Sequence, residues 1–185
     1  MPTSLPQAYI IGLSGLLFII AILVGRQLFK VRKNEVDLVK LEKEASINSE
    51  SPAKLYELAS VQLKKRLYPQ ATKSLKQALT KIKDEPDDAK AIIQNALGFS
   101  LAAQDNFKEA IIHYQKAIQA KDSYPVALNN LAFAKQKLLQ QEEAYELYEK
   151  VLKIDPKNQT AKKQLDKIKK LRKNTSSNIS YKKGF

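Results

Sequence analysis

A spacing of thirty-four residues recurs in this chain and constrains its fold more than any other feature. Asn95, Leu97, Gly98, Phe99, Glu109, Ala110 and Tyr114 return, one interval later, as Asn129, Leu131, Ala132, Phe133, Glu143, Ala144 and Tyr148. Repeats of this length are helix pairs that bury their apolar side only by stacking on neighbouring repeats. The pattern therefore predicts an all-α stack of helices, an architecture suited to holding another molecule.

The interval is that of the tetratricopeptide repeat (TPR), and three units fit its pattern. They cover residues 52–90, 91–124 and 125–158, and an amphipathic capping helix follows over residues 159–173. If the small residue of the first helix is numbered position 8, a second small residue falls at position 20 and a large one at position 24. Those residues are Ala59, Ala71 and Leu75, then Gly98, Ala110 and Tyr114, then Ala132, Ala144 and Tyr148. We expect a right-handed α-solenoid of three TPR helix pairs, in which small residues let two helices touch and large ones fill the grooves.

The first unit differs from the others in its spacing, because 39 residues separate Pro52 from the equivalent Ala91. We expect its second helix to run long and the connection to turn at residues 84–88. There Pro86 would end one helix and Asp88 would cap the next. Inside the second and third units, we expect the turns at Asp105-Asn106 and Gln140-Gln141.

The first 25 residues carry no charge, and residues 8–25 form an unbroken apolar run. As a helix this run is about 27 Å long, close to the thickness of a bilayer core. It is apolar on every side, which disfavours a buried core helix and predicts an N-terminal transmembrane helix. Basic residues follow at once, at Arg26, Lys30, Arg32 and Lys33. The positive-inside rule then places the N-terminus outside and residues 26–51, a basic exit segment and helical stalk, on the cytoplasmic side.

The net charge of +13 is concentrated at one end of the chain. Residues 159–185 hold nine basic residues and one acidic residue, whereas the second and third units are neutral. This basic segment is either the solvated outer face of a capping helix or a site for an anionic partner. Residues 174–185 show no periodicity, and we expect them to be disordered.

Few residues in the sequence are suited to catalysis or to binding a metal. There is no cysteine and one histidine, and Gly98 is the only glycine between Gly25 and Gly184. Thiolate chemistry, disulfides, cysteine-based metal sites and a P-loop are thereby excluded. We expect no enzyme activity, no cofactor and no metal.

In TPR proteins the first helix of each unit lines the concave face of the stack. The residues expected to bind a partner there are Tyr56, Asn95, Phe99, Asn129, Asn130, Phe133, Lys137, Lys163 and Lys167. Stacked asparagine amides can both donate to and accept from a peptide backbone. The alternative is that Phe99 and Phe133 pad the core between helices. A chaperone co-receptor is disfavoured, because Tyr56, Ser60, Ala96, Val126 and Asn130 occupy the positions at which that subclass grips a terminal carboxylate.

The chain as a whole resembles a known family. It combines a charge-free leader with Leu5-Pro6, the exit sequence Gly25-Arg26-Gln27 followed by Lys30-Val31-Arg32-Lys33, and three TPR units with a gapped first connection. This combination is similar to the photosystem I assembly TPR proteins of cyanobacteria and algal plastids. The resemblance implies a single-pass thylakoid membrane protein with its N-terminus in the lumen and its repeats on the stromal or cytoplasmic side. It further implies partners among photosystem I subunits or other assembly factors, and no cofactor.

Two other functions fit the same sequence less well. One is a membrane-tethered TPR receptor or scaffold for protein translocation or envelope biogenesis. The other is a nucleic-acid or anionic-lipid binder that works through the basic C-terminal segment. Lysine outnumbers arginine by 28 to 4, and the bidentate fork that reads phosphate belongs to arginine. We therefore expect neither a nucleic acid nor a small-molecule substrate.

Overall fold

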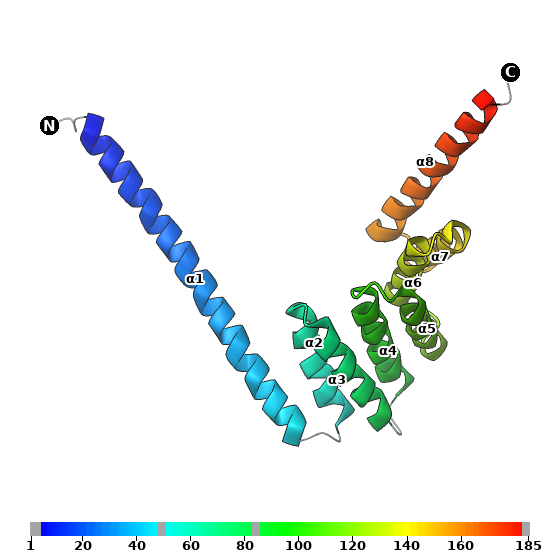
Figure 1. Ribbon diagram of the computed structural model, residues 1–185, viewed down its shortest axis with the longest axis horizontal. Coiled ribbons are helices and arrows are strands. Elements are labelled where there is room, and N and C mark those ends of the chain that lie inside the picture. Colours follow the sequence, from blue (N-terminus) through cyan, green and yellow to red (C-terminus); the bar gives the residue numbers. More distant parts are fainter. Residues whose placement is uncertain (1–4, 48–50, 83–85, 183–185) are drawn as a thin grey trace. The chain divides into compact units, whose positions relative to one another are not determined.

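The computed structural model describes residues 5–47, 51–82 and 86–182, and within these ranges the regular structure is entirely helical (Figure 1). The helices are α1 (Leu5–Ile47), α2 (Pro52–Lys64), α3 (Tyr68–Lys81), α4 (Asp87–Ala102), α5 (Phe107–Ala120), α6 (Pro125–Lys137), α7 (Gln141–Ile154) and α8 (Gln159–Lys182). They form two compact units, Met1–Ile47 and Asn48–Phe185. Part of the expected leader (residues 1–4), part of the first connection (83–85) and residues 183–185 lie outside the described residues. The all-α fold predicted from the repeat is confirmed.

The N-terminal unit contains one unbroken helix, α1, of 43 residues. Its segment Tyr9–Phe29 has 21 residues and is exposed along its length. At 1.5 Å per residue, this segment is about 30 Å long, which matches the hydrocarbon core of a bilayer. By length and composition, α1 therefore contains a candidate membrane span.

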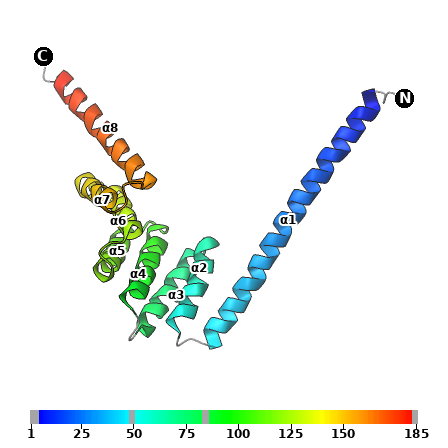
Figure 2. The ribbon, with the colours of Figure 1, turned by 180° about the vertical axis from the view of Figure 1, so that it is seen from behind.

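The second unit is a solenoid of antiparallel helix pairs. Helix α2 packs on α3, α4 on α5 and α6 on α7, and each pair also contacts the next through α3 with α4 and α5 with α6. Figure 2 shows the same order from behind. Helix α8 packs on α7 in the place that the first helix of a further unit would take. This arrangement is the predicted TPR stack with its capping helix.

Small residues bring the two helices of each unit together. Ala59, Ala71, Ala110, Ala132 and Ala144 are completely buried at positions 8 and 20. At Gly98 a Cβ atom would lie 2.7 Å from two ring carbons of Tyr114, so only a hydrogen fits there. Burial of the Tyr114 and Tyr148 rings raises the pKa of both hydroxyl groups. The large residues at position 24 thus fill the space that the small ones leave.

Helix α8 closes the stack with an apolar side. Ala161, Leu165 and Ile168 are at most 4% exposed and join one core cluster with Tyr148 and Val151. The helix continues past Lys173 to Lys182, although residues 174–185 were expected to be disordered. Residues 174–182 contain neither proline nor glycine, and a helix already nucleated on the core propagates until such a residue stops it.

The extra residues of the first connection lengthen α4, the first helix of the second unit. The expectation that α3, the second helix of the first unit, would run long is therefore wrong. Helix α3 has 14 residues, as do α5 and α7. Helix α4 has 16 residues and begins at Asp87, about one turn before the equivalent start at Ala91. Asp88 lies inside this first turn, and Pro86 holds the N-cap position. Two carboxylates at a helix N-terminus are favoured by the helix dipole, which explains why α4 begins early.

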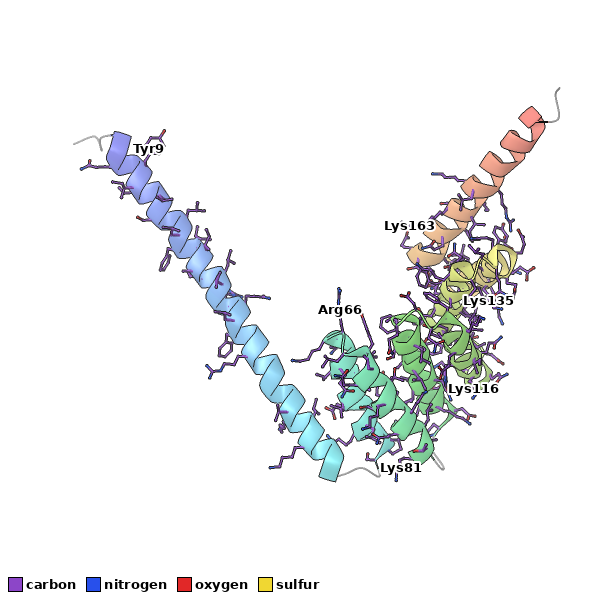
Figure 3. The ribbon with its side chains drawn as sticks, in the orientation of Figure 1. Tyr9, Arg66, Lys81, Lys116, Lys135 and Lys163 are labelled. Atoms are coloured by element: carbon purple, nitrogen blue, oxygen red, sulfur yellow. The ribbon has the colours of Figure 1, made fainter. Side chains whose placement is uncertain are left out.

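Each unit turns between its helices through a residue with left-handed backbone geometry. Arg66, Asp105 and Leu139 all occupy position 15 and have φ angles of 60°, 59° and 62°. The next N–H then donates to a carbonyl five residues back, for example from Asn106 to Leu101 at 3.0 Å, as in a Schellman helix end. Figure 3 shows Arg66 at the turn between α2 and α3. The third turn lies at Leu139 and Gln140, one residue earlier than expected, because residue 139 is the repeat equivalent of Asp105.

Candidate protein-binding site

The first helices of successive units lie next to one another, with α4 in contact with both α2 and α6. By the repeat register, positions 2, 5, 9 and 13 of these helices and of α8 belong to the same side of the stack, which we call the concave face. It contains Ala53, Tyr56, Ser60 and Lys64 from α2, Ile92, Asn95, Phe99 and Ala103 from the second unit, Val126, Asn129, Phe133 and Lys137 from α6, and Thr160, Lys163, Lys167 and Leu171 from α8.

The middle of the concave face is apolar and exposed. Phe99 and Phe133, at the same position in consecutive units, are 44% and 43% exposed. Ile92 and Val126 are 38% and 53% exposed at the position about two helical turns before them. Both rings therefore face solvent and do not pad the core. A contiguous apolar strip of this kind on a folded domain is typical of an interaction site.

A lysine borders this strip. The ammonium of Lys137 lies 5.5 Å from the ring centroid of Phe133 and 5.9 Å from that of Phe107, within cation–π range. The two rings meet edge to face, with centroids 6.4 Å apart. Phe107 was not predicted for the site, because it begins a second helix and the register assigns only first helices to the concave face. An aromatic residue directly after the Asp105 turn is the signal that could have found it.

The asparagines of the site are bonded to one another and to the repeat framework. Asn130 Nδ2 donates to Asn95 Oδ1 at 3.0 Å, which links α6 to α4. Asn129 Nδ2 donates at 3.1 Å to Asn158 Oδ1, an atom that also accepts the Ala161 N–H at the start of α8. These amides join consecutive units, which leaves them less able to bind the backbone of a peptide.

Asn95 has a second partner in Tyr124, the residue before α6. Burial raises the pKa of the Tyr124 hydroxyl, as does the nearby Tyr56, whereas a hydrogen bond from Asn95 lowers it. Burial is the largest of these effects on the pKa of the Tyr124 hydroxyl. Tyr56, Asn95 and Tyr124 therefore form a polar contact between units.

Tyr56 also borders a small apolar pocket at the beginning of the concave face. The pocket measures about 170 Å³ and lies between α2 and α4. Ile82, Ala89 and Ile92 complete much of its wall. Ala89 belongs to the additional turn of α4, so the pocket is a direct consequence of the longer first connection.

The two lysines predicted on the capping helix are exposed. Figure 3 shows Lys163 near the start of α8. Lys167 and Lys170 follow at helical spacing on the same side, together with one carboxylate, Asp166. The concave face thus changes from apolar on α4 and α6 to basic on α8.

The side chain of His113 joins two helices of the second unit. Its Nδ1 lies 2.7 Å from Oε1 of Gln94, which joins α5 to α4, and its Nε2 lies 4.0 Å from Glu109. Burial lowers the pKa of the imidazole, and the nearby Lys116 lowers it further. In the described part of the chain, no group of three or more His, Cys, Asp or Glu side chains could hold a metal ion.

Solved structures share this fold. The chain aligns with the MamA protein at a TM-score of 0.69 and 20% identity, over 82% of this chain and 80% of that one. It aligns with the first TPR domain of Spaghetti (RPAP3), solved with the HSP90 peptide SRMEEVD, at a TM-score of 0.61 and 22% identity, over 67% of this chain and 94% of that one. At these identities the likeness concerns the fold alone.

Sequence relatives point to a narrower group. The tetratricopeptide repeat family matches residues 125–158. The chloroplastic TPR protein PYG7 of Arabidopsis thaliana is 32% identical over 90% of this chain, which spans about half (55%) of PYG7. The ycf37 protein of Cyanophora paradoxa is 31% identical over 92% of this chain and 99% of its own length. The chain therefore belongs to the ycf37 family of TPR proteins from plastids and cyanobacteria, the photosystem I assembly family that its N-terminal apolar run, exit sequence and repeats resemble.

Proposed function

We propose that this protein is a membrane-anchored, non-enzymatic scaffold that holds a protein partner on its concave face and thereby assists photosystem I assembly or stability. The observation that carries the proposal is the exposure of Phe99 and Phe133 at the same position of consecutive units. The apolar area that these two rings leave in water, at 44% and 43% exposure, is area that a partner can bury with a gain in free energy. Membership of the ycf37 family supports photosystem I assembly as the process in which that partner would take part.

The proposed place of action is the thylakoid membrane. The uncharged run of residues 8–25 in α1 would span the bilayer, and the basic residues that begin at Arg26 would stay on the stromal or cytoplasmic side. The N-terminus would then lie in the lumen and the repeats outside it. The plastid origin of the relatives supports this assignment.

The test is affinity purification of the tagged full-length protein from gently solubilised thylakoids. We expect photosystem I subunits or another assembly factor in the eluate, and a protein that resists extraction by alkaline carbonate. The double variant Phe99→Ala, Phe133→Glu should release the partner without loss of helicity by circular dichroism.

A matched control is Ile112→Glu, which places a charge on a residue that is 50% exposed on the second helix α5. This variant should keep the partner. Equal loss from both variants would show that any new surface charge disrupts binding, and the concave face would then not be the site. Recovery of protein-translocation components, with no photosystem I subunit or assembly factor, would instead favour a translocation receptor.

A further inference from the structure

The chemistry of the partner can be inferred further, on the basis of the proposed function. The asparagines that could bind a peptide backbone are engaged inside the domain, through Asn130 with Asn95 at 3.0 Å and Asn129 with Asn158 at 3.1 Å. These amides are therefore less available to the backbone of a partner, and recognition on the concave face rests mainly on the side chains of the partner. What the face still offers is an apolar strip and a set of ammonium groups.

The ammonium groups lie at one end of this strip. Lys137 closes the strip beside Phe133, and Lys163 and Lys167 continue the same register on α8. No carboxylate stands at positions 2, 5, 9 or 13 of any of the four first-type helices. Asp166 is the one acidic residue beside these lysines on α8, so the end of the face carries a net positive charge.

Several lysines outside the concave face are paired with carboxylates. Lys135 pairs with Glu143 at 2.7 Å, Lys76 with Glu109 at 3.2 Å and Lys121 with Asp88 at 3.2 Å. Within the described residues, neither Lys163 nor Lys167 forms such an ion pair. Cations beside an apolar strip and without carboxylate partners are complementary to an acidic ligand.

We propose that the partner is an extended protein segment that seats an apolar side chain on Phe99 and Phe133 and directs carboxylate side chains to Lys137, Lys163 and Lys167. Side-chain carboxylates suffice, and a free C-terminus is not needed, because the residues that grip a terminal carboxylate in other TPR proteins are absent. An anionic membrane is a poorer fit, since Ala161, Leu165 and Ile168 on the apolar side of α8 are buried against the stack.

The experiment measures peptide binding to the full-length protein in detergent micelles by fluorescence anisotropy. The probe is a peptide of about twelve residues, roughly 40 Å when extended, blocked at both ends. It has a serine and glycine background with one phenylalanine followed by three glutamates. Two comparison peptides replace the glutamates by lysine or the phenylalanine by serine. We expect saturable binding of the first peptide, weaker binding without phenylalanine and none with lysine.

Charge reversal then tests the assigned lysines. Lys163→Glu with Lys167→Glu should weaken binding of the acidic peptide by about tenfold or more, and added salt should weaken binding to the native protein. Lys150→Glu with Lys153→Glu makes the same charge change on exposed residues of α7 and should leave binding within about twofold. Circular dichroism checks that both variants are folded.

Several outcomes would overturn the inference. The lysine peptide could bind as tightly as the acidic peptide, or both pairs of lysine variants could lose binding equally. The acidic peptide could bind only when its C-terminus is free. Finally, the protein could capture anionic vesicles and not bind the acidic peptide. The proposed function fails separately, in the thylakoid purification. If that purification recovers photosystem I subunits while the acidic peptide does not bind, only the inferred partner chemistry is wrong.

Discussion

The first and third units have the same fold but are held to their neighbours in different ways. At the seam between the first and second units, Thr72 Oγ1 and Ser100 Oγ lie 2.7 Å apart, and Ser100 Oγ donates to the Tyr68 carbonyl at 2.8 Å. The equivalent positions at the next seam hold Ile111 and Ala134, and those at the last seam hold Tyr145 and Ile168. At this pair of positions, hydroxyl groups at the first seam are therefore replaced by largely apolar side chains at the later ones.

The cores of the two units also differ. Position 24 is Leu75 in the first unit and Tyr148 in the third, where the hydroxyl also donates to Gln136 at 2.9 Å. The first unit buries a polar pair, Ser74 and Gln62, at 2.9 Å. The third unit and α8 form one apolar cluster. The TPR geometry thus fixes residue size at a few positions and leaves the way in which the units join open to variation.

The largest effect is expected from Tyr148→Ala. Loss of a fully buried ring and its hydrogen bond should lower the free energy of unfolding by about 3–5 kcal/mol, and the cavity would open next to α8. Leu75→Ala at the same position of the first unit should cost about 2–3 kcal/mol. Urea unfolding followed by circular dichroism measures both. An equal loss would show that the third unit is no better packed than the first.

A smaller effect is expected at the polar seam. A hydroxyl has one proton, so Ser100 donates to Tyr68, Thr72 donates to Ser100, and Gln104 Nε2 donates to Thr72 at 3.0 Å. Ser100→Ala would leave the Tyr68 carbonyl and the Thr72 hydroxyl without these partners. The free energy of unfolding should fall by about 1–3 kcal/mol.

The control for this prediction replaces both hydroxyl residues of the first seam by the apolar residues found at the equivalent positions of the next seam. Thr72→Ile with Ser100→Ala installs the residue pair of the next seam, Ile111 and Ala134. Replacing both partners of a hydrogen bond by apolar groups costs little, so the double variant should be more stable than Ser100→Ala alone. If it is less stable, the seam geometry of the first unit differs from that of the second, and the two are not interchangeable.

The sequence predicted the elements that depend on residue size. Ala59, Ala71 and Leu75 lie buried in the first unit where the repeat register placed them, even though that unit is the weakest match. The register could not show where the five extra residues of the first connection would go. Their placement depends on the balance between lengthening α3 and starting α4 early, and the acidic pair at Asp87 and Asp88 favours α4.

Only part of the candidate site could be predicted from the sequence. The register placed Phe99 and Phe133 on one face, but whether a ring at that position is exposed depends on how far apart the units stand. The role of Asn129 depends on its reach to Asn158, twenty-nine residues later, and no local pattern encodes that contact. Composition and spacing thus locate a binding face, whereas the groups that remain free on it require the packed structure.

The smallest expected effect on stability is at position 15, which is Arg66 in the first unit and Leu139 in the third. Leu139 adopts left-handed geometry with φ 62° and is 83% exposed, so its side chain stabilises little in return for the backbone cost. Leu139→Gly should relieve that cost and raise the Tm by about 2–4 °C, the shift that corresponds to about 1 kcal/mol in a chain of this size. Arg66→Gly should do nearly the same, and Asp105→Gly less, because aspartate tolerates this geometry. Thermal unfolding of the three variants gives the order, and a lower Tm for Leu139→Gly would mean that the exposed leucine makes a contact that the folded chain needs.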